Sequence, residues 1–368
     1  MKKVLTLLLA LTMVLGLVSG CAKSSTPSAD PTKAPEATTA PEATTAPETE
    51  ATIAPEASGG AKTGLAVITS LGKSTAATAD AEGLAQTDAA IFAVLVGADG
   101  KILDCKIDAA QTKIKFSADG KITSDKAAEY KSKQQLGDEY GMRGSSKIGK
   151  EWNEQADAFA AYVVGKTVDE VKGLAVTEEG VAGDADLAAS VTVHIADFIE
   201  GVAEAVANAQ DLGAGAADKL GLGVTTDIAS SKDAAADADG LAQAYTNIAV
   251  VTVDAGNKIT SCFIDAVQGN VNFNTTGAIT TDLTVAPQAK QVLKDAYGMK
   301  KASSIGKEWY EQANAFSAYV TGKTVDEVNG IALNEEGKAA DADLAASVTV
   351  HVGPFMANIT KAVENAAK

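Results

Sequence analysis

The sequence predicts an α+β protein in which two tandem homologous domains, each a small antiparallel sheet packed with helices, follow an export signal and a disordered stalk. Three observations support this prediction: an N-terminal leader over residues 1–21, a low-complexity stretch over 22–60, and an internal duplication over 61–211 and 218–368. With 368 residues and 46% apolar composition, the chain can bury two cores of ordinary size.

The leader has the features of a bacterial lipoprotein signal. Lys2 and Lys3 precede an apolar run over residues 4–17, and Val18-Ser19-Gly20-Cys21 places small residues before a cysteine. This stretch resembles a lipobox, which implies cleavage before Cys21 and acylation of its thiol. We therefore expect an extracytoplasmic protein that is anchored by lipid on Cys21 to the outer face of the cell membrane.

The stretch that follows the leader has no hydrophobic periodicity. Between residues 22 and 60 the motif APEATT begins at Ala34 and again at Ala40, and the composition is rich in Pro, Thr and Glu. Proline opposes helix formation and these side chains have little to bury, so the sequence predicts a disordered stalk.

The charge balance excludes one class of partner. The chain has 48 acidic and 31 basic residues, for a formal net charge of −17. Such a surface repels polyphosphate, so we expect no nucleic-acid partner.

The duplication is the strongest signal in the chain. GKEW begins at Gly149 and Gly306, GKTVDEV begins at Gly165 and Gly322, and DADLAASVTVH begins at residues 184 and 341, always 157 positions apart. Copies that align without insertion or deletion predict the same fold twice. A short Gly/Ala-rich link near residues 212–215 separates the two domains.

Each copy is predicted to open with a β-hairpin. The runs AAIFAVLV (89–96) and NIAVVTV (247–253) are short and apolar, and each precedes a Gly-containing turn. In the next strand Leu103, Cys105 and Ile107 alternate with polar residues and are predicted to face the core together. A further short strand pair is expected near 114–116 and 121–123.

The cysteines of these strands have two readings. Cys262 occupies the position equivalent to Cys105, so both are predicted to be buried thiols. A disulfide between the domains is the alternative, and it would require the two core faces to meet.

Helices are predicted in the second part of each copy. An apolar stripe that includes Ile148, Trp152 and Val163 follows two serines and stops at Gly165. Thr167 and Glu170 form the pattern of a capping box for a second, shorter helix, and the pattern recurs in the second copy at Thr324 and Glu327.

Two aromatic positions of this part leave alternatives open. Trp152 and Trp309 fit core packing, with ring stacking on a ligand as the alternative. Tyr140-Gly141-Met142 and Tyr297-Gly298-Met299 fit either a packed loop or the wall of a cleft.

The last segment of each copy is predicted to be helical. Leu187, Val191, Ile195 and Phe198 recur at helical spacing, so Asp186 could cap one long helix that ends near residue 209. A strand over 190–195 is the alternative. In the second copy Pro354 predicts a break or kink.

The order of these elements resembles the FMN-binding domain family, whose members carry a D-x-x-[ST]-G-A-[ST] motif with the last hydroxyl esterified to FMN by a flavin transferase. The Asp-to-Thr spacing recurs in both copies, while Ser-Val stands in place of Gly-Ala. The candidate flavin-binding residues that the resemblance implies are Asp186, Ser190 and Thr192 in the first copy and Asp343, Ser347 and Thr349 in the second, with Ser190 and Ser347 at the position of the motif glycine.

The resemblance implies a flavin-carrying surface lipoprotein that holds FMN in each copy, covalently or not, and transfers electrons to a redox partner. The alternative is a non-redox surface lipoprotein that has lost the flavin and has a ligand-binding or structural role. A carrier is favoured over an enzyme, because the Ser, Thr and His of DLAASVTVH lack a nucleophile elbow.

The two histidines, His194 and His351, occupy equivalent positions of this motif. They fit either a polar position at a domain boundary or a ligand contact. One His and one core Cys per copy do not make a transition-metal ligand set, so no metal is expected.

Overall fold

A computed structural model describes residues 60–368, which belong to one compact unit. The predicted leader, the predicted acylation site Cys21 and the predicted stalk up to residue 59 lie outside the described residues. Within the described part, no helix is long and apolar enough to cross a membrane.

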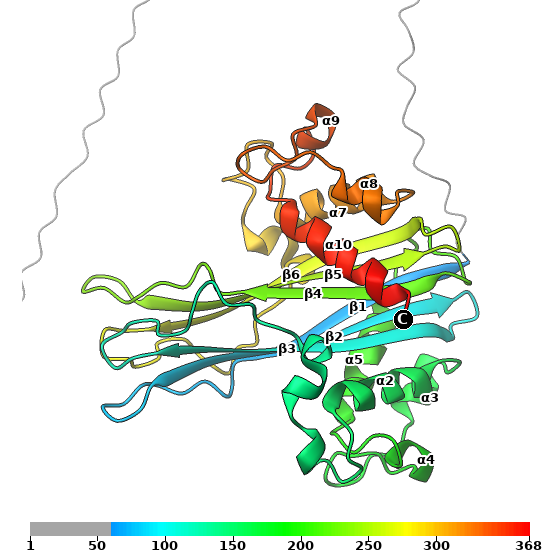
Figure 1. Cartoon of the computed structure of the whole chain (residues 1–368), viewed down its shortest axis with the longest axis horizontal. Coiled ribbons are helices and arrows are strands. Elements are labelled where there is room, and N and C mark those ends of the chain that lie inside the picture. Colours follow the sequence, from blue (N-terminus) through cyan, green and yellow to red (C-terminus); the bar gives the residue numbers. More distant parts are fainter. Residues whose placement is uncertain (1–59) are drawn as a thin grey trace, which may run out of the picture. The chain divides into compact units, whose positions relative to one another are not determined.

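Two antiparallel sheets of three strands form the centre of the unit (Figure 1). In each sheet the strands are hydrogen-bonded in chain order. The strands are β1 (Ala61–Ser70), β2 (Gly83–Gly97) and β3 (Ile102–Phe116) in one sheet, and β4 (Lys219–Asp227), β5 (Gly240–Val253) and β6 (Ile259–Phe273) in the other. With the helices that follow each sheet, this confirms the predicted α+β class.

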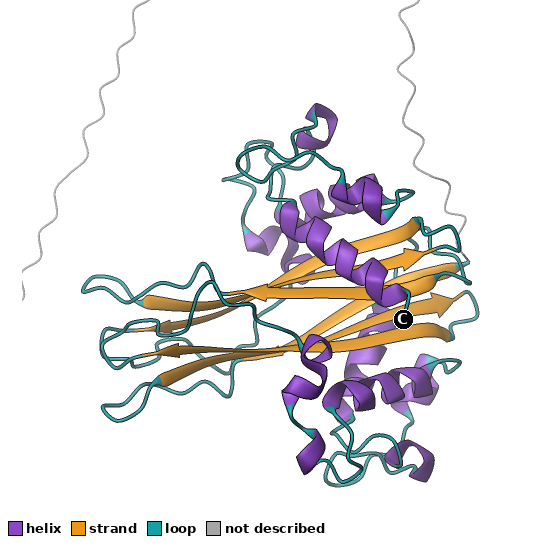
Figure 2. Cartoon of the chain, in the orientation of Figure 1, coloured by secondary structure: helices purple, strands orange, loops and turns teal. Residues whose placement is uncertain are grey.

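Helices lie above and below the two sheets in Figure 2, and apart from η2 they follow each sheet in the same order along the described chain. The first set comprises α1 (Lys133–Leu136), η1 (Gly137–Tyr140), η2 (Arg143–Ser145), α2 (Trp152–Val163), α3 (Val168–Lys172), α4 (Ala185–Ala188) and α5 (Ala196–Ala207). The second set comprises α6 (Lys290–Leu293), η3 (Lys294–Tyr297), α7 (Trp309–Val320), α8 (Val325–Asn329), α9 (Ala342–Ala345) and α10 (Gly353–Ala366).

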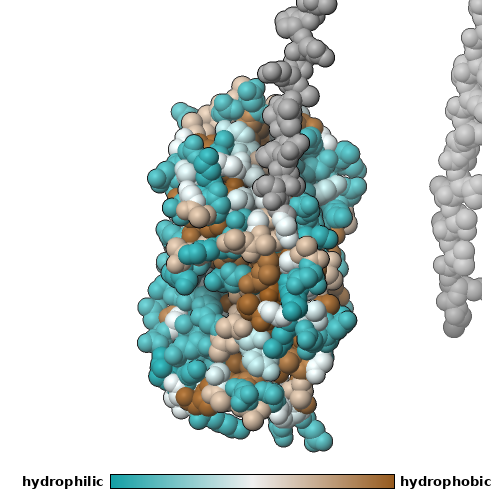
Figure 3. Space-filling model, turned by 90° about the vertical axis from the view of Figure 1, so that its right-hand side faces the viewer, coloured by the Kyte–Doolittle hydropathy of each residue, from teal (hydrophilic) through white to brown (hydrophobic). Residues whose placement is uncertain are grey.

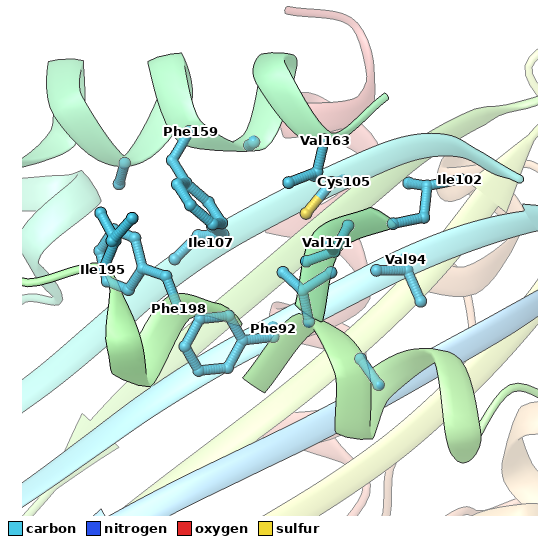
Figure 4. Close-up of a cluster of buried hydrophobic side chains, with 14 of the residues drawn as sticks. Phe92, Val94, Ile102, Cys105, Ile107, Phe159, Val163, Val171, Ile195 and Phe198 are labelled. Atoms are coloured by element: carbon cyan, nitrogen blue, oxygen red, sulfur yellow. The ribbon is translucent and has the colours of Figure 1, made fainter. Parts of the chain in front are cut away.

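The outer face of each sheet is covered by its own helices. Helix α5 packs on β1 and β2, and α2 packs on β3; α10 and α7 cover the second sheet in the same way. Figure 4 shows the first of these cores, where Phe92 of β2 meets Phe198 of α5 edge to face, with ring centroids 6.0 Å apart. Each half therefore has a core of its own between sheet and helices.

The inner faces of the two sheets pack against each other. Leu65, Ile91 and Leu95 of the first sheet share a buried cluster with Leu222 and Val250 of the second. In the end-on view an apolar patch lies near mid-height in a mainly hydrophilic surface, with smaller apolar patches toward the lower end (Figure 3). The two halves are thus joined by a common core as well as by the chain.

Contacts between the halves occur in reciprocal pairs. The amide of Ala77 donates to the carbonyl of Gly277, and the amide of Ala234, which is equivalent to Ala77, donates to Gly120, which is equivalent to Gly277. The equivalent rings of Phe116 and Phe273 stack on each other at 4.3 Å. This reciprocity is the geometry of a two-fold interface, here made within one chain.

The predicted hairpins are confirmed, and the strands are longer than expected. Strand β2 begins at Gly83, and the sequence 114–116 is the end of β3, from which Phe116 pairs with Ile122 through an isolated bridge. The first strand of each sheet, β1 and β4, was missed, because its alternation is obscured by burial on both faces.

The expected orientation of Leu103 is wrong. The register shifts at Leu95 and Val96, so that Leu103 packs in the cluster between the sheets while Cys105 and Ile107 face the helices. An extra residue in one strand reverses the alternation locally. Cys105 and Cys262 are buried and free, in separate cores, which confirms the buried-thiol reading over the disulfide.

The helix expected to follow the two serines begins later than the apolar stripe indicated. Ile148 lies in the preceding loop, and α2 begins at Trp152 after the cap Glu151, which forms a capping box with Glu154. The capping boxes predicted at Thr167 and Thr324 are confirmed by side-chain and backbone contacts with Glu170 and Glu327.

The expected single long helix at the end of each copy is wrong. Helix α4 ends at Ala188 and α5 begins at Ala196, so the residues between them form a loop. The cap is Asp184 rather than Asp186, and Asp341 rather than Asp343 in the second copy. Pro354 lies in the first turn of α10, where it needs no amide hydrogen.

Candidate functional site

The candidate flavin-binding residues lie on the short helices α4 and α9 and in the loops that join α4 to α5 and α9 to α10. Asp186 and Asp343 are exposed in the first turn of their short helices. Ser190, Thr192, Ser347 and Thr349 are half-buried. The three motif residues of each copy therefore differ in exposure.

The motif threonine of each copy is held by a buried glutamine. The Oε1 atom of Gln312 accepts hydrogen bonds from the Thr349 amide at 2.8 Å and from its hydroxyl at 3.1 Å. Gln155 receives the same pair from Thr192, at 2.7 and 3.2 Å. Both glutamines are fully buried. The loop keeps a fixed position on α2 or α7 because a side chain satisfies backbone amides that no helix satisfies.

A cavity of about 440 Å³ opens beside this loop in the second half. Strands β5 and β6, the starts of α6, α7 and α10, and the α9–α10 loop form its walls. The lining residues are Tyr245, Asn247, Gln268, Lys290, Tyr297, Trp309, Lys338, Thr349, Val350, His351, Pro354 and Phe355. The volume of the cavity is within the size range of small-molecule sites. Of the candidate flavin-binding residues, Thr349 is in its lining.

Lys290 is the central polar residue of the cavity. Its side chain is only 2% exposed, and Nζ donates a hydrogen bond to the Tyr245 hydroxyl at 2.7 Å. The ammonium lies 4.4 Å from the ring centroids of Tyr245 and Tyr297 and 4.9 Å from that of Trp309. Three π-faces stabilise the cation where water is largely excluded.

Burial shifts the titration of this residue and of its neighbour Asp265. Desolvation lowers the pKa of Lys290 to about 7, and the Asp265 carboxylate opposes the shift. Desolvation also raises the pKa of Asp265 to about 7, against hydrogen bonds from the amides of Gln291 and Ala266. Burial raises the pKa of Tyr245 as well, so its hydroxyl stays protonated at neutral pH. The cavity therefore contains an amine that titrates near neutrality.

Lys338 and His351 are the other basic residues that line the cavity. Lys338 is half-buried and pairs with Glu336 at 2.7 Å, and His351 is exposed. Two amines and an imidazole thus line one cavity, and donors of this kind are suited to an anionic group on a ligand. Tyr297 packs against the core of the second half and also lines the cavity, so both interpretations of this position apply. Trp309 is buried in the core and also lines the cavity.

The first half keeps part of this arrangement. Lys133 lies 4.7 Å from the Tyr140 ring centroid and 4.8 Å from that of Trp152. Asp88 occupies the position of Tyr245, where it accepts hydrogen bonds from the side-chain amides of Gln86 and Gln111. A carboxylate at this position makes the first half less suited to an anion than the second.

Sequence reasoning missed Lys290 and Tyr245, which are 45 positions apart and meet only through the fold. One signal was present: a lysine occupies the same position of both copies, at 133 and 290. Among the described residues, no group of three or more His, Cys, Asp or Glu side chains is placed to hold a metal ion.

No protein-family model matches the chain, and no solved structure matches it. A stretch of 41 residues is 51% identical to chlorophenol reductase from Desulfitobacterium hafniense. The stretch amounts to 11% of this chain and 12% of that protein.

Proposed function

We propose that this protein is a lipid-anchored, extracytoplasmic flavin carrier, with two homologous halves raised from the membrane on a stalk, and that the cavity around Lys290 binds FMN. The observation that carries this proposal is the combination of aromatic rings and basic groups in one cavity. The leader with Cys21 supplies the membrane anchor, and a redox partner outside the membrane would exchange electrons with the flavin.

The lining residues fit the two chemical parts of FMN. Tyr245 and Tyr297 offer half-buried rings beside which a planar isoalloxazine can pack. Lys290, Lys338 and His351 offer hydrogen-bond donors for a phosphate. The flavin, when bound, would supply the redox chemistry, and the protein would supply binding and orientation.

Non-covalent binding fits the geometry better than an ester bond to threonine. The Thr349 hydroxyl donates its hydrogen to Gln312, and its backbone amide is bound to the same oxygen. Ser347 and Val348 stand where the family motif has Gly and Ala, so the approach of a phosphate to the backbone is narrower. We therefore propose one non-covalent FMN in the second half, in place of one in each copy.

Titration of FMN into the purified protein, followed by quenching of flavin fluorescence, tests the proposal. We expect one FMN per chain, and we expect Lys290→Met to weaken binding roughly tenfold or more, since a charge-assisted hydrogen bond is lost. Lys133→Met changes the equivalent residue of the first half and is the matched control. Saturable binding that Lys290→Met leaves unchanged would place the flavin elsewhere.

The hydrogen bonds of the two motif threonines also fit the alternative, a surface protein without a flavin. Gln155 and Gln312 give Thr192 and Thr349 a structural role that needs no cofactor. A surface protein that binds a different planar anion in the cavity would show no FMN binding in this titration, while Lys290 would still govern its affinity for that anion.

A further inference from the structure

The two halves differ in charge at the positions that line the cavity around Lys290. The lining in the second half contains two lysines, Lys290 and Lys338, and no carboxylate. The equivalent positions of the first half, 157 residues earlier, contain one lysine, Lys133, and two carboxylates, Asp88 and Asp197. The duplication has therefore given one set of positions that attracts an anion and one that repels it.

One of these positions lies beside the lysine itself. In β5, Tyr245 is opposite Gln268 of β6, and its hydroxyl accepts a hydrogen bond from Lys290 at 2.7 Å. The hydroxyl is uncharged, so it holds the ammonium without neutralising it. Gln268 also lines the cavity, where its side-chain amide can donate a hydrogen bond to a ligand.

The same position of the first half has the opposite effect. Asp88 is opposite Gln111 and accepts hydrogen bonds from the side-chain amides of Gln86 at 2.9 Å and of Gln111 at 3.1 Å. Lys73 lies 3.9 Å from this carboxylate, but its side chain is 69% exposed, and an exposed ion pair of this length neutralises little. Asp88 therefore adds a negative charge and also occupies the amide that, at Gln268, is part of the cavity lining.

Other ionisable groups near the cavity are common to both halves. Asp265 is buried close to Lys290, and Asp108, its equivalent, is buried as well. His351 of the lining recurs as His194, and both histidines are exposed. Groups that both halves share cannot give the two halves different preferences for a charged ligand.

The two remaining charge differences are weaker than the one at position 245. Lys338 is paired with Glu336 at 2.7 Å, so much of its charge is already balanced. Asp197 is exposed, and water screens its carboxylate. Tyr245 is half-buried and contacts the buried lysine directly. A charge at this position acts where the dielectric screening is lowest.

We propose that Tyr245 makes the cavity of the second half selective for aromatic anions, and that Asp88 excludes such anions from the first half. The inference deepens the proposed function and rests on it for the choice of cavity, since FMN is one aromatic anion. The rings supply the planar contact, Lys290 supplies the positive charge, and Gln268 supplies a further donor.

Two fluorescent probes that differ by one sulfonate group test the proposal. Anilinonaphthalene sulfonate is an aromatic anion, phenylnaphthylamine is the same ring system without the charge, and both brighten when they leave water. We expect the wild type to bind the anion saturably. Tyr245→Asp should weaken anion binding roughly a hundredfold, because it places a like charge beside the bound sulfonate, and should weaken binding of the neutral probe about threefold or less.

Two further variants are the controls. Tyr245→Phe keeps the ring and adds no charge, so it should weaken anion binding about fivefold or less, the effect of one hydrogen bond. Asp88→Tyr makes the reverse change in the first half and should not weaken anion binding at all. The proposal is rejected if the wild type does not bind the anion, or if Tyr245→Asp keeps both probes or loses both to the same degree.

The same variants separate this proposal from the flavin proposal. Anion binding that follows the expected pattern, in a protein that does not bind FMN, would contradict the flavin and support the selectivity of Tyr245. FMN that binds equally well to the wild type and to Tyr245→Asp would support the flavin and overturn the selectivity.

Discussion

Gly221→Ala is expected to lower the free energy of unfolding by about 3 kcal/mol or more, the upper range for inserting a methyl group into a packed interior. A Cβ atom at Gly221 would lie 1.9 Å from the carbonyl oxygen of Ala362 in α10. That atom belongs to helix backbone, so it cannot rotate away as a flexible side chain would. Either α10 must move off β4 or the variant does not fold.

Urea unfolding followed by circular dichroism measures this effect. Gly64, the equivalent residue of β1, faces Ala205 of α5 at 2.0 Å, and Gly64→Ala should be destabilising to a similar degree. Gly144→Ala is the control, because no heavy atom lies within 4 Å of its added Cβ. An unfolding midpoint for Gly221→Ala equal to that of the control would show that α10 does not pack on β4 as described.

Lys290→Met is expected to change the pH dependence of stability. The pKa of Lys290 is about 7 in the folded protein, below the ordinary value of 10.5, so the unfolded state binds more protons between these values. Stability that depends on Lys290 therefore rises as pH increases above about 7, by at most about 1.4 kcal/mol per pH unit. Below pH 7 both states are protonated, and the penalty of burying the cation is constant.

The measurement is the free energy of unfolding of wild type minus that of Lys290→Met, at several values from pH 6.5 to 9.5. The range stops at pH 9.5 because burial also raises the pKa of Tyr245 and Tyr297. Above this pH the titration of tyrosine would add to the pH dependence that is due to Lys290. The difference should increase steadily across the range. Lys133→Met shows what the same substitution does at a half-buried position. A flat difference for Lys290→Met would mean that this amine is not desolvated.

Features that depend on neighbouring residues could be predicted from the sequence. The capping boxes at Thr167 and Thr324 involve residues three positions apart, and the burial of Cys105 follows from strand alternation. The duplication gave each of these predictions a second instance in the same chain. The predicted orientation of Leu103 was wrong because one extra residue in the strand is enough to turn a side chain to the other face of the sheet. Alternation in the sequence does not reveal such an extra residue.

The prediction of one long terminal helix was wrong because of a contact between residues far apart in the sequence. Val191 and Ile195 are buried at helical spacing, yet the backbone there is a loop, because Gln155 accepts from the amides of Thr192 and Val193. The partner is 37 positions away, so no local pattern indicates it. The burial of Lys290 was missed for a similar reason. A lysine is expected at the surface, and the three rings, the Tyr245 hydroxyl and the Asp265 carboxylate that stabilise it inside come together only through the fold.

The most direct test of the flavin-carrier account is a mass spectrum of the protein purified from its native host, recorded before and after denaturation, with the visible spectrum of the same sample. The account predicts lipid on Cys21, a yellow native protein with one FMN per chain, and release of all flavin on denaturation. A colourless native protein without flavin mass would contradict flavin carriage. Flavin that stays attached after denaturation would contradict the non-covalent cavity around Lys290.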